Sequence, residues 1–359
     1  MSKMDISHDT PTHVRAGEEI DLGALNKYLL QSDIFKAPIV EVRQFPGGYS
    51  NLTYFLKTQD QQEFVLRRPP FGAEHIKGGH DVAREYRVLT MIQSAGFTKI
   101  PKPLLLCDDV SVMGCPFYIM QRVQGVILRA QTAQTLNLSP TQLRATSEAL
   151  VDNLVDLHAL DINATGLIQL GKPEGYVKRQ VEGWYKRYLA AQTDDLPVME
   201  QLYQWLTAAM PAEGTPTLIH NDYKYDNVVL NPADLSEILA VLDWEMCTVG
   251  DPLMDVGTAL SYWSEAGDGT FERSFNLTWL PGNLTRQQFA DRYAERSGRD
   301  VSNMLYYYVF GLFKNTVVMQ QIYARWKKGL TQDARFGGLL FGIKSLSDNA
   351  VQAVERGMF

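Results

Sequence analysis

Three side chains with oxygen ligands stand close together in the second half of a chain of 359 residues. Asn227 follows Asp222 by five positions, and Asp243 follows Asn227 by sixteen. Carboxylate and amide oxygens are ligands for Mg²⁺, which usually keeps waters and substrate phosphates in the rest of its shell. Asn227 and Asp243 could therefore hold a magnesium ion shared with a nucleotide, while Asp222 accepts a proton from a hydroxyl group.

A β-hairpin is predicted between these positions. The apolar runs 228–230 and 238–242 flank the turn-forming sequence Asn231-Pro232-Ala233-Asp234, and this pattern predicts two strands joined by a turn. Because a hairpin brings the chain back to its starting point, we expect Asp243 to lie beside Asn227. The alternative is an ordinary hairpin with polar residues at its ends.

This stretch resembles the catalytic loop and metal-binding segment of the protein-kinase-like superfamily. Protein kinases carry H-R-D-x-x-x-x-N followed by D-F-G. Here the chain reads His220-Asn221-Asp222, then Asn227 at the same spacing, then Asp243-Trp244-Glu245. The Trp-Glu variant is similar to the aminoglycoside phosphotransferase family, the small-molecule kinases of the superfamily. His-x-Asp alone is a weak signal, whereas the full combination is specific.

The resemblance implies a role for each residue. Asp222 would orient an acceptor hydroxyl and take its proton, and Asn227 and Asp243 would hold Mg²⁺ against the phosphates of ATP or GTP. Lys224 stands two residues after Asp222, where many protein kinases carry a lysine that meets the γ-phosphate; a solvated lysine is the alternative. We also place Glu245 among the residues that contact the acceptor.

A Gly-Gly sequence in the first third of the chain is a second candidate site. Gly47, Gly48, Ser50 and Asn51 separate two extended runs, and a Gly-Gly turn can bring backbone N–H groups close to phosphates. A simple hairpin turn is the alternative. In the family that the chain resembles, a Gly-Gly-x-Ser-Asn loop covers the nucleotide, which implies that these four residues bind it.

The strand predicted at 63–68 and the helix after it imply a charged pair. In kinases this strand carries the lysine that pairs with the α- and β-phosphates, and here the matching residue is Arg67. Arginine keeps the charge and can bind phosphate through two N–H groups, although its reach differs. Glu85 stands at the family's ion-pair glutamate and would hold Arg67. The alternatives are a solvent-facing arginine and a glutamate on a solvated helix face.

The segment from Gln121 to Gly125 follows a predicted strand at 116–120 and should join the two lobes. In the superfamily the adenine ring hydrogen-bonds to backbone groups of this segment. The resemblance therefore implies backbone contacts from Gln121 and Val123.

Two residues are candidates for supporting the catalytic loop. Asp251 and Pro252 predict the start of a helix, which places Asp255 at the end of the first turn. The family retains this aspartate, which implies that it holds the loop backbone; a favourable charge at a helix N-terminus explains it equally well. His158 could support the same loop but fits better as a hydrogen-bonded core histidine.

The helical pair predicted over 174–210 resembles the kinase-like domains fused to some acyl-CoA dehydrogenases, a resemblance that covers roughly residues 35–265. Its first helix interleaves basic and aromatic residues: Lys178, Arg179, Lys186 and Arg187 with Tyr176, Trp184, Tyr185 and Tyr188. Cations beside aromatic faces suit an anionic ligand with an apolar part, and the resemblance implies hydroxyacyl thioester acceptors. We place Lys178, Arg179 and Trp184 in the acceptor site. Alternatively, the cations are solvated and the aromatics form the core.

Composition limits the function classes. The net charge of −7, without blocks of like charge, argues against a nucleic-acid partner. The chain has no apolar run of eighteen residues, so we expect no membrane span, and its first twenty residues predict no signal peptide. The three widely spaced cysteines fit reduced thiols in a cytoplasmic protein.

These observations predict an α+β class and a two-lobed protein-kinase-like fold. We expect an N-terminal segment with a short helix at 1–34, a nucleotide-binding lobe with an antiparallel sheet and one helix at 35–122, and a mainly helical catalytic and substrate-binding lobe at 123–359. Residues 264–284 should form an irregular loop that faces the acceptor. The expected reaction transfers the γ-phosphoryl group of a nucleotide to a small-molecule hydroxyl.

Other interpretations of the function remain open. One is a kinase-like module that binds a nucleotide without transferring phosphate, which the exchange of lysine for arginine at position 67 favours slightly. Another is an aminoglycoside kinase. A third is a protein kinase, against which the Asp-Trp-Glu sequence and the lack of a following Ala-Pro-Glu segment speak.

Overall fold

The computed structural model describes residues 10–46, 51–71, 81–130, 136–330 and 334–359. The chain divides into two compact units. The first unit comprises residues 1–127, 228–234 and 238–246, and the second comprises residues 128–227, 235–237 and 247–359.

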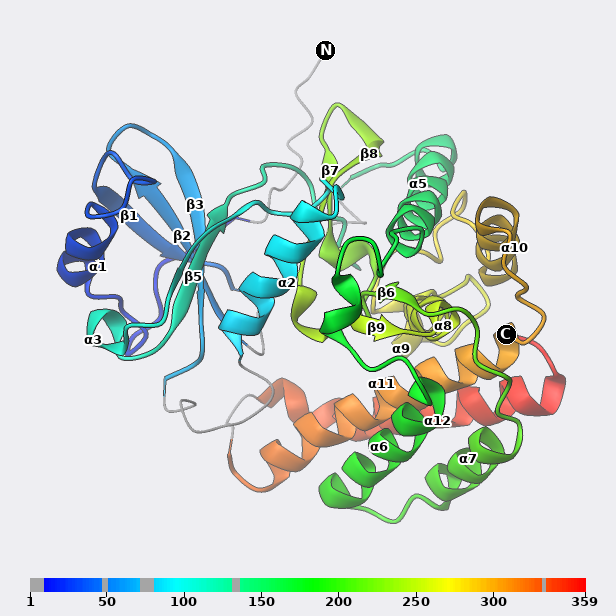
Figure 1. The fold of residues 1–359 in the computed structure, drawn as a ribbon. Helices are drawn as coiled ribbons and strands as arrows, with labels where there is room; N and C mark the ends of the chain where they lie inside the picture. Colours follow the sequence, from blue (N-terminus) through cyan, green and yellow to red (C-terminus); the bar gives the residue numbers. More distant parts are fainter. Residues whose placement is uncertain (1–9, 47–50, 72–80, 131–135, 331–333) are drawn as a thin grey trace. The chain divides into compact units, whose positions relative to one another are not determined.

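An antiparallel sheet forms the centre of the first unit (Figure 1). Its strands, in the order β1-β2-β3-β5-β4, are β1 Ile39–Gln44, β2 Leu52–Thr58, β3 Glu63–Arg68, β5 Phe117–Gln121 and β4 Pro103–Cys107. Side chains alternate between the faces of a strand, so Leu66 joins the apolar cluster on one face while its neighbour Arg67 points to the other.

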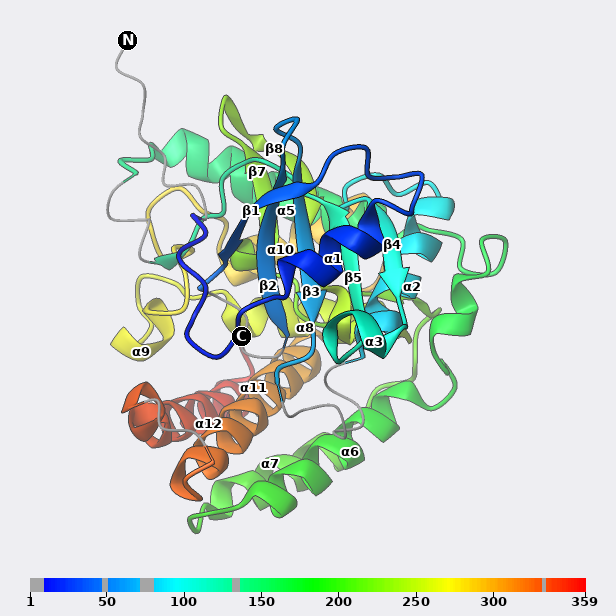
Figure 2. The ribbon, with the colours of Figure 1, turned by 90° about the vertical axis from the view of Figure 1, so that its left-hand side faces the viewer.

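Helices cover both faces of this sheet. Figures 1 and 2 show α1 Leu22–Leu29 and α3 Val110–Met113 on one face and α2 Val82–Ser94 on the other. Asp21 and Asp81 cap α1 and α2 as the sequence predicts, each accepting a backbone N–H in the first turn. The helix α3 was not predicted, because Asp109 reads as a turn residue but here caps a single helical turn.

The predicted hairpin is confirmed. Its strands are β7 Val228–Asn231 and β8 Asp234–Val241, with Val228 paired to Val241. The short helix η3 Trp244–Met246 follows. The strand β8 begins at the turn, earlier than its apolar run predicts, because the exposed end of a strand can carry polar residues such as Asp234 and Glu237.

Helices dominate the second unit: α5 Pro140–His158, α6 Tyr176–Ala191, α7 Pro197–Ala208, α8 Pro252–Tyr262, α9 Thr270–Arg273, α10 Arg286–Ser297, α11 Met304–Lys327 and α12 Leu339–Arg356. The short elements are η1 Leu167–Leu170, η2 Tyr225–Asn227, η4 Ala334–Gly338 and the paired strands β6 Thr217–Ile219 and β9 Thr248–Gly250.

The long helix α11 is the packing centre of this unit and lies against α6, α8 and α12 (Figure 1). Two glycines let α11 and α8 approach backbone to backbone. A Cβ atom on Gly257 would lie 2.2 Å from the carbonyl oxygen of Tyr307, and one on Gly311 would lie 2.4 Å from that of Gly257. The close approach brings the middle of α11 next to the segment before α8.

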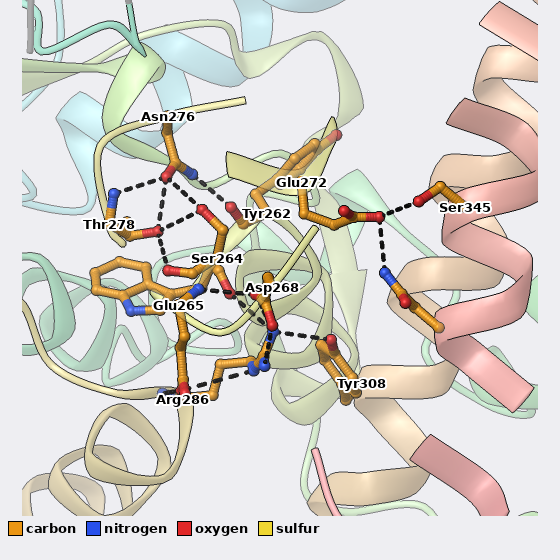
Figure 3. A network of polar contacts seen from close by, with 12 residues as sticks. Tyr262, Ser264, Glu265, Asp268, Glu272, Asn276, Thr278, Arg286, Tyr308 and Ser345 are labelled. Atoms are coloured by element: carbon orange, nitrogen blue, oxygen red, sulfur yellow. Dashed lines mark hydrogen bonds and ion pairs between the residues drawn. The ribbon is translucent and has the colours of Figure 1, made fainter. Parts of the chain in front are cut away.

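The segment 264–284 is more ordered than the expected irregular loop. The Thr278 hydroxyl lies 2.7 Å from the Asn276 amide oxygen and 2.8 Å from the Ser264 carbonyl, either of which can accept its hydrogen. Arg286 bonds both oxygens of Asp268 at 2.9 and 3.0 Å, and Figure 3 shows these contacts forming one network. Glycine-rich composition predicted the irregular backbone but not the polar contacts that fix it.

The cysteines agree with the expectation of reduced thiols. Cys107, Cys115 and Cys247 are buried, and none of them forms a disulfide with another described residue. Within the part of the chain that the structure describes, no helix has the length and apolarity needed to cross a membrane.

Candidate active site

The predicted catalytic loop follows β6, and Asp255 on α8 holds its backbone. One carboxylate oxygen accepts the backbone N–H of His220 at 2.6 Å, and the other accepts that of Asn221 at 2.7 Å. The predicted role of Asp255 in holding the loop backbone is therefore confirmed. The buried Asp255 carboxylate bonds these two loop N–H groups and His158. Burial alone would raise the pKa of Asp255, but the His158 hydrogen bond and the nearby histidines outweigh it, and the pKa lies below its usual value.

His158 is a satisfied core histidine, as expected. Its Nε2 lies 3.2 Å from Asp255, and its Nδ1 lies 2.8 Å from the hydroxyl of Tyr293. Because it contacts Asp255, it also supports the loop indirectly. His158 is therefore both a hydrogen-bonded core histidine and a support for the loop.

Asp222 forms a close pair with Lys224. The Nζ atom of Lys224 donates to both carboxylate oxygens at 2.9 Å and lies 4.4 Å from the centre of the Tyr262 ring. The alternative of a freely solvated Lys224 is therefore wrong. The Asp222 side chain keeps 16% of its surface exposed, which leaves one side open to a ligand.

Lys224 keeps the Asp222 carboxylate ionised. Burial alone would raise the pKa of Asp222, but Lys224, with a smaller contribution from Lys314, outweighs it and holds the pKa below its ordinary value. Burial would lower the pKa of Lys224, yet Asp222 raises it above its usual value. Asp222 is thus ionised and Lys224 charged throughout the neutral range.

Asn227 lies at the end of the same loop, in the second unit, and bonds Asp222. Its side-chain amide donates to the backbone carbonyl of Asp222 at 2.8 Å and to the Asp222 carboxylate at 2.9 Å. Since the amide nitrogen is used in this way, the amide oxygen is the group it can offer to a cation. The structure thus brings Asp222, Lys224 and Asn227 together.

The first unit holds the other charged group of the predicted site. Arg67 donates to Glu85 at 2.6 Å and to Asp243 at 3.3 Å, and it lies 3.8 Å from Glu245. Both Arg67 and Glu85 are buried, so the alternatives of a solvent-facing arginine and a solvated glutamate are wrong. Burial alone would lower the pKa of Arg67, but Glu85 and its acidic neighbours raise it well above its usual value.

Asp243 is the residue of this cluster that can offer a ligand to a divalent cation. Arg67 contacts three carboxylates, Glu85, Asp243 and Glu245, but the described residues contain no group of three or more acidic, histidine or cysteine side chains that could hold a metal by themselves. Asp243 has 33% of its side chain exposed, so one of its oxygens can reach a ligand. Hard carboxylate oxygens of this kind suit Mg²⁺. Asn227 precedes β7 in the second unit and Asp243 follows β8 in the first, so their proximity stays a prediction.

Three residues of the expected nucleotide loop, Gly47, Gly48 and Ser50, lie outside the described residues. Asn51 is described and buried immediately before β2. These four positions stay predictions as nucleotide ligands.

The segment after β5 is held against the hairpin. Val126 and Leu230 exchange backbone hydrogen bonds of 2.9 and 2.8 Å. A Cβ atom on Gly125 would lie 2.5 Å from the Leu230 carbonyl, so only glycine fits this approach. Val123 packs on the apolar cluster of Ile127, Val229 and Ala240. The N–H of Gln121 donates to Lys102, so an adenine contact from Gln121 would use its carbonyl.

The expected acceptor residues on α6 have different surroundings. Trp184 is buried, with Arg187 at 4.4 Å and Lys314 at 5.9 Å from its ring centre. The Lys178 side chain is 69% exposed, and Arg179 donates to the carbonyls of Lys172 and Glu174. Tyr176 and Tyr188 are also buried, as the core alternative predicts. The predicted residue Glu245 lies in the first unit beside Arg67.

Sequence reasoning missed Lys314, which donates to the backbone carbonyl of Asn221 at 2.5 Å. The available signal was a single lysine inside an aromatic and aliphatic run of helix 304–327. The aromatic and aliphatic residues of this helix indicate a core helix, and one lysine among them does not by itself indicate a functional site.

Comparison with known proteins agrees with this geometry. A model of the phosphotransferase enzyme family matches residues 41–291, and the chain belongs to this family. The chain is similar to a solved Ralstonia eutropha JMP134 protein whose name places it among the aminoglycoside phosphotransferases, with 29% identity and a TM-score of 0.79 over 94% of this chain and 99% of that one. The predicted family and kinase-like α+β fold are therefore confirmed.

Two curated relatives are longer than this chain. Acyl-CoA dehydrogenase family member 10 of Mus musculus is 35% identical over 89% of this chain and 30% of its own length. Acyl-CoA dehydrogenase family member 11 of Gallus gallus is 34% identical over 89% of this chain and 41% of its own length. The chain thus spans less than half the length of these relatives, in agreement with the resemblance to kinase-like domains of such proteins.

Proposed function

We propose that the protein transfers the γ-phosphoryl group of ATP or GTP to a hydroxyl of a small anionic metabolite, with hydroxyacyl thioesters such as hydroxyacyl-CoA as the favoured class. The observation that carries the proposal is Asp222, an ionised carboxylate in a loop fixed by Asp255 and paired with Lys224. Membership of a phosphotransferase family supports the reaction type.

Asp222 accepts a hydrogen bond from the acceptor hydroxyl and turns its oxygen toward the γ-phosphorus. The new bond joins this oxygen to phosphorus, and the bond to the β-phosphate oxygen breaks, so that the nucleoside diphosphate leaves. The hydroxyl proton moves to the Asp222 carboxylate. Because the pKa of Asp222 is low, it takes the proton late, when the attacking oxygen has become acidic.

Other residues bind and neutralise the nucleotide. The amide oxygen of Asn227 and the carboxylate of Asp243 would hold Mg²⁺, which supplies neutralisation of phosphate charge when bound. Arg67, held by Glu85 at 2.6 Å, donates to the α- and β-phosphates. Lys224 stays protonated and donates a hydrogen bond from one of its ammonium N–H groups to the γ-phosphate. The backbone of Gln121 and Val123 and the segment Gly47 to Asn51 bind the adenine and the phosphates.

Charge supports an anionic acceptor. The cations Lys314 and Arg187 lie against the Trp184 ring in the same unit as Asp222, and Lys178 and Arg179 lie on the same helix as Trp184. A site for polycationic aminoglycosides would need surplus carboxylates instead. The names of the curated relatives, which refer to acyl-CoA dehydrogenases, support an acceptor derived from an acyl thioester.

A metabolite panel scored by ADP release tests the proposal. It should contain hydroxyacyl-CoA thioesters, their free hydroxy acids, kanamycin-type aminoglycosides and the unsubstituted acyl-CoA as a matched compound without hydroxyl. We expect ADP release to rise only with hydroxylated anions, and to fall when Lys178 and Arg179 are both replaced by glutamate. Efficient phosphorylation of an aminoglycoside would contradict the acceptor class.

A second candidate is a module that binds a nucleotide without transferring phosphate. The hydrogen bond between Arg67 and Asp243 favours it, because an arginine that occupies Asp243 competes with a metal ion. Tight binding of Mg·ATP together with ADP release no faster than that of Asp222→Asn, across the whole panel, would support this candidate instead.

A further inference from the structure

Lys314 is a charged residue in an apolar environment. It lies in the middle of α11 and is 3% exposed, and it is the sole lysine that is buried within the described ranges. Burying an ammonium group is costly, and replacing a buried charge by an apolar residue of similar size is often neutral or stabilising. Stability of the helix packing alone therefore does not explain a lysine here.

The ammonium group reaches the catalytic loop. It donates to the backbone carbonyl of Asn221 at 2.5 Å, one residue before Asp222. Asn221 has a φ of +66°, in the left-handed region that side chains other than glycine adopt rarely, although asparagine tolerates it better than most. Such a conformation persists only where surrounding contacts fix it.

Three helices fix Asn221 at three different groups. Asp255 on α8 accepts its N–H at 2.7 Å, Tyr176 on α6 bonds its side chain at 3.2 Å, and Lys314 on α11 bonds its carbonyl. The peptide that begins with this carbonyl also contains the N–H of Asp222. A shift of this carbonyl would therefore also move the backbone N–H of Asp222.

No carboxylate forms an ion pair with Lys314 within the described part of the chain. Among the carboxylates around it, Asp222 is paired with Lys224, and Asp255 accepts loop N–H groups. The cations Lys224 and Arg187 also face Lys314 and oppose its charge. The positive charge of Lys314 is thus available to act on the loop and on Asp222.

We propose that Lys314 is a positioning residue for the reaction: in its charged form it holds the Asn221 carbonyl and so orients the Asp222 carboxylate toward the acceptor hydroxyl. This inference rests on the proposed function of Asp222. It assigns a part in the reaction to α11, a helix outside the recognised loop motifs.

The protonation of Lys314 makes the inference measurable. Burial lowers the pKa of Lys314 from 10.5 to about 8, against the opposing effect of Asp222 and Asp255. Its neighbours do not lose their charge in that range, because the pKa of Asp222 is lowered and that of Lys224 is raised. A loss of activity as the pH rises through about 8 would therefore report Lys314.

The first test measures ADP release from Mg·ATP, with water as the acceptor, between pH 6 and 10. The parent rate should fall above about pH 8. Lys314→Met and Lys314→Gln should lower the rate at pH 7 by on the order of 10²-fold and lack the alkaline decline. Lys344→Met, which replaces an exposed lysine of α12, is the matched control and should behave as the parent. A parent-like rate and pH profile in Lys314→Met would overturn the inference.

A second measurement separates this inference from the proposed function. If the parent releases ADP no faster than Asp222→Asn, the proposed function fails, and amide hydrogen exchange then tests Lys314 alone. Exchange at residues 219–224 should become faster in Lys314→Met and Lys314→Gln while α8 and α12 keep their protection. Unchanged exchange in the loop of folded variants would overturn the role of Lys314.

Discussion

At the scale of single residues, Arg67 can bond two carboxylates with one planar group, which a lysine at the same position could not do in the same geometry. Its planar guanidinium bonds Glu85 and Asp243 at once, whereas an ammonium is a compact point charge without this fork geometry. The pair with Glu85 is buried, and removing one partner of a buried pair leaves an uncompensated charge. We therefore expect position 67 to affect stability and, under the proposed function, phosphate binding as well.

Substitutions of Arg67 should separate these two effects. Arg67→Ala is expected to lower the free energy of unfolding by roughly 3–5 kcal/mol, because Glu85 stays buried without its partner. Arg67→Lys should keep most of the stability and part of the Mg·ATP affinity. Urea unfolding and nucleotide titration measure both quantities. A free energy of unfolding for Arg67→Ala equal to that of the parent would show that the pair is not stabilising.

Lys314 links stability to pH with a defined sign. Its pKa is about 8 in the folded protein and 10.5 ordinarily, so between these values the unfolded chain binds more protons. Stability contributed by this group therefore rises with pH in that window. Relative to Lys314→Met, the parent should gain up to about 3 kcal/mol in free energy of unfolding from pH 7 to 10.5. Urea unfolding of both proteins measures this, and a pH-independent difference would refute it.

At the scale of elements, a glycine controls how the segment after β5 meets the hairpin. Gly125→Ala places a Cβ atom 2.5 Å from the Leu230 carbonyl and from a methyl group of Val229. We expect a loss of about 1–3 kcal/mol in the free energy of unfolding and weaker ATP binding, because the backbone of Val123 shifts.

The control for this prediction is Gly183→Ala on α6, where nothing lies within 4 Å of the added Cβ atom. Alanine is the better helix former by about 1 kcal/mol, so this variant should be as stable as the parent or more stable. Thermal unfolding compares the two variants. Equal melting temperatures for them would contradict the steric account of Gly125.

Elements with local signals could be predicted from the sequence. Capping aspartates and apolar periodicity predicted α1, α2 and α8, and the turn sequence predicted the hairpin. The strands β6 and β9 were missed because each has three residues and exists through its pairing with the other. The helix α10 was overlooked although Thr285 and Gln288 form a capping box, which is a recognisable signal.

In the candidate site, too, residues with a local motif could be predicted, whereas a residue placed by tertiary packing could not. Asp222, Lys224 and Asn227 lie within six residues and carry a motif, so their contacts could be expected. Lys314 is 93 residues from Asn221, and a lysine in a helix ordinarily faces solvent. Only the close approach of α11 to α8 turns it toward the loop, and that approach depends on tertiary packing around Gly257 and Gly311.

At the scale of the whole molecule, the proposed magnesium site joins residues that are sixteen positions apart in the sequence. Its proposed ligands are the Asp243 carboxylate and the Asn227 amide oxygen. Asp243→Ala should abolish the Mg²⁺-dependent part of ATP affinity, because it removes the charged ligand, and Asn227→Ala should reduce it less. Calorimetric titration with and without Mg²⁺ measures the effect. Unchanged Mg·ATP affinity in both variants would remove the metal assignment.

The family model that matches residues 41–291 places the chain among phosphotransferases, and our central proposal is that Asp222 accepts the proton of the acceptor hydroxyl during phosphoryl transfer. The most direct measurement compares the rate of ADP release in the parent and in Asp222→Asn, with the acceptor found in the panel and with Mg·ATP affinity measured alongside. The amide keeps the size of the side chain but cannot accept the proton. We predict unchanged Mg·ATP affinity and a rate lowered by about 10²–10⁴-fold. Turnover of the same acceptor at the parent rate would contradict the account.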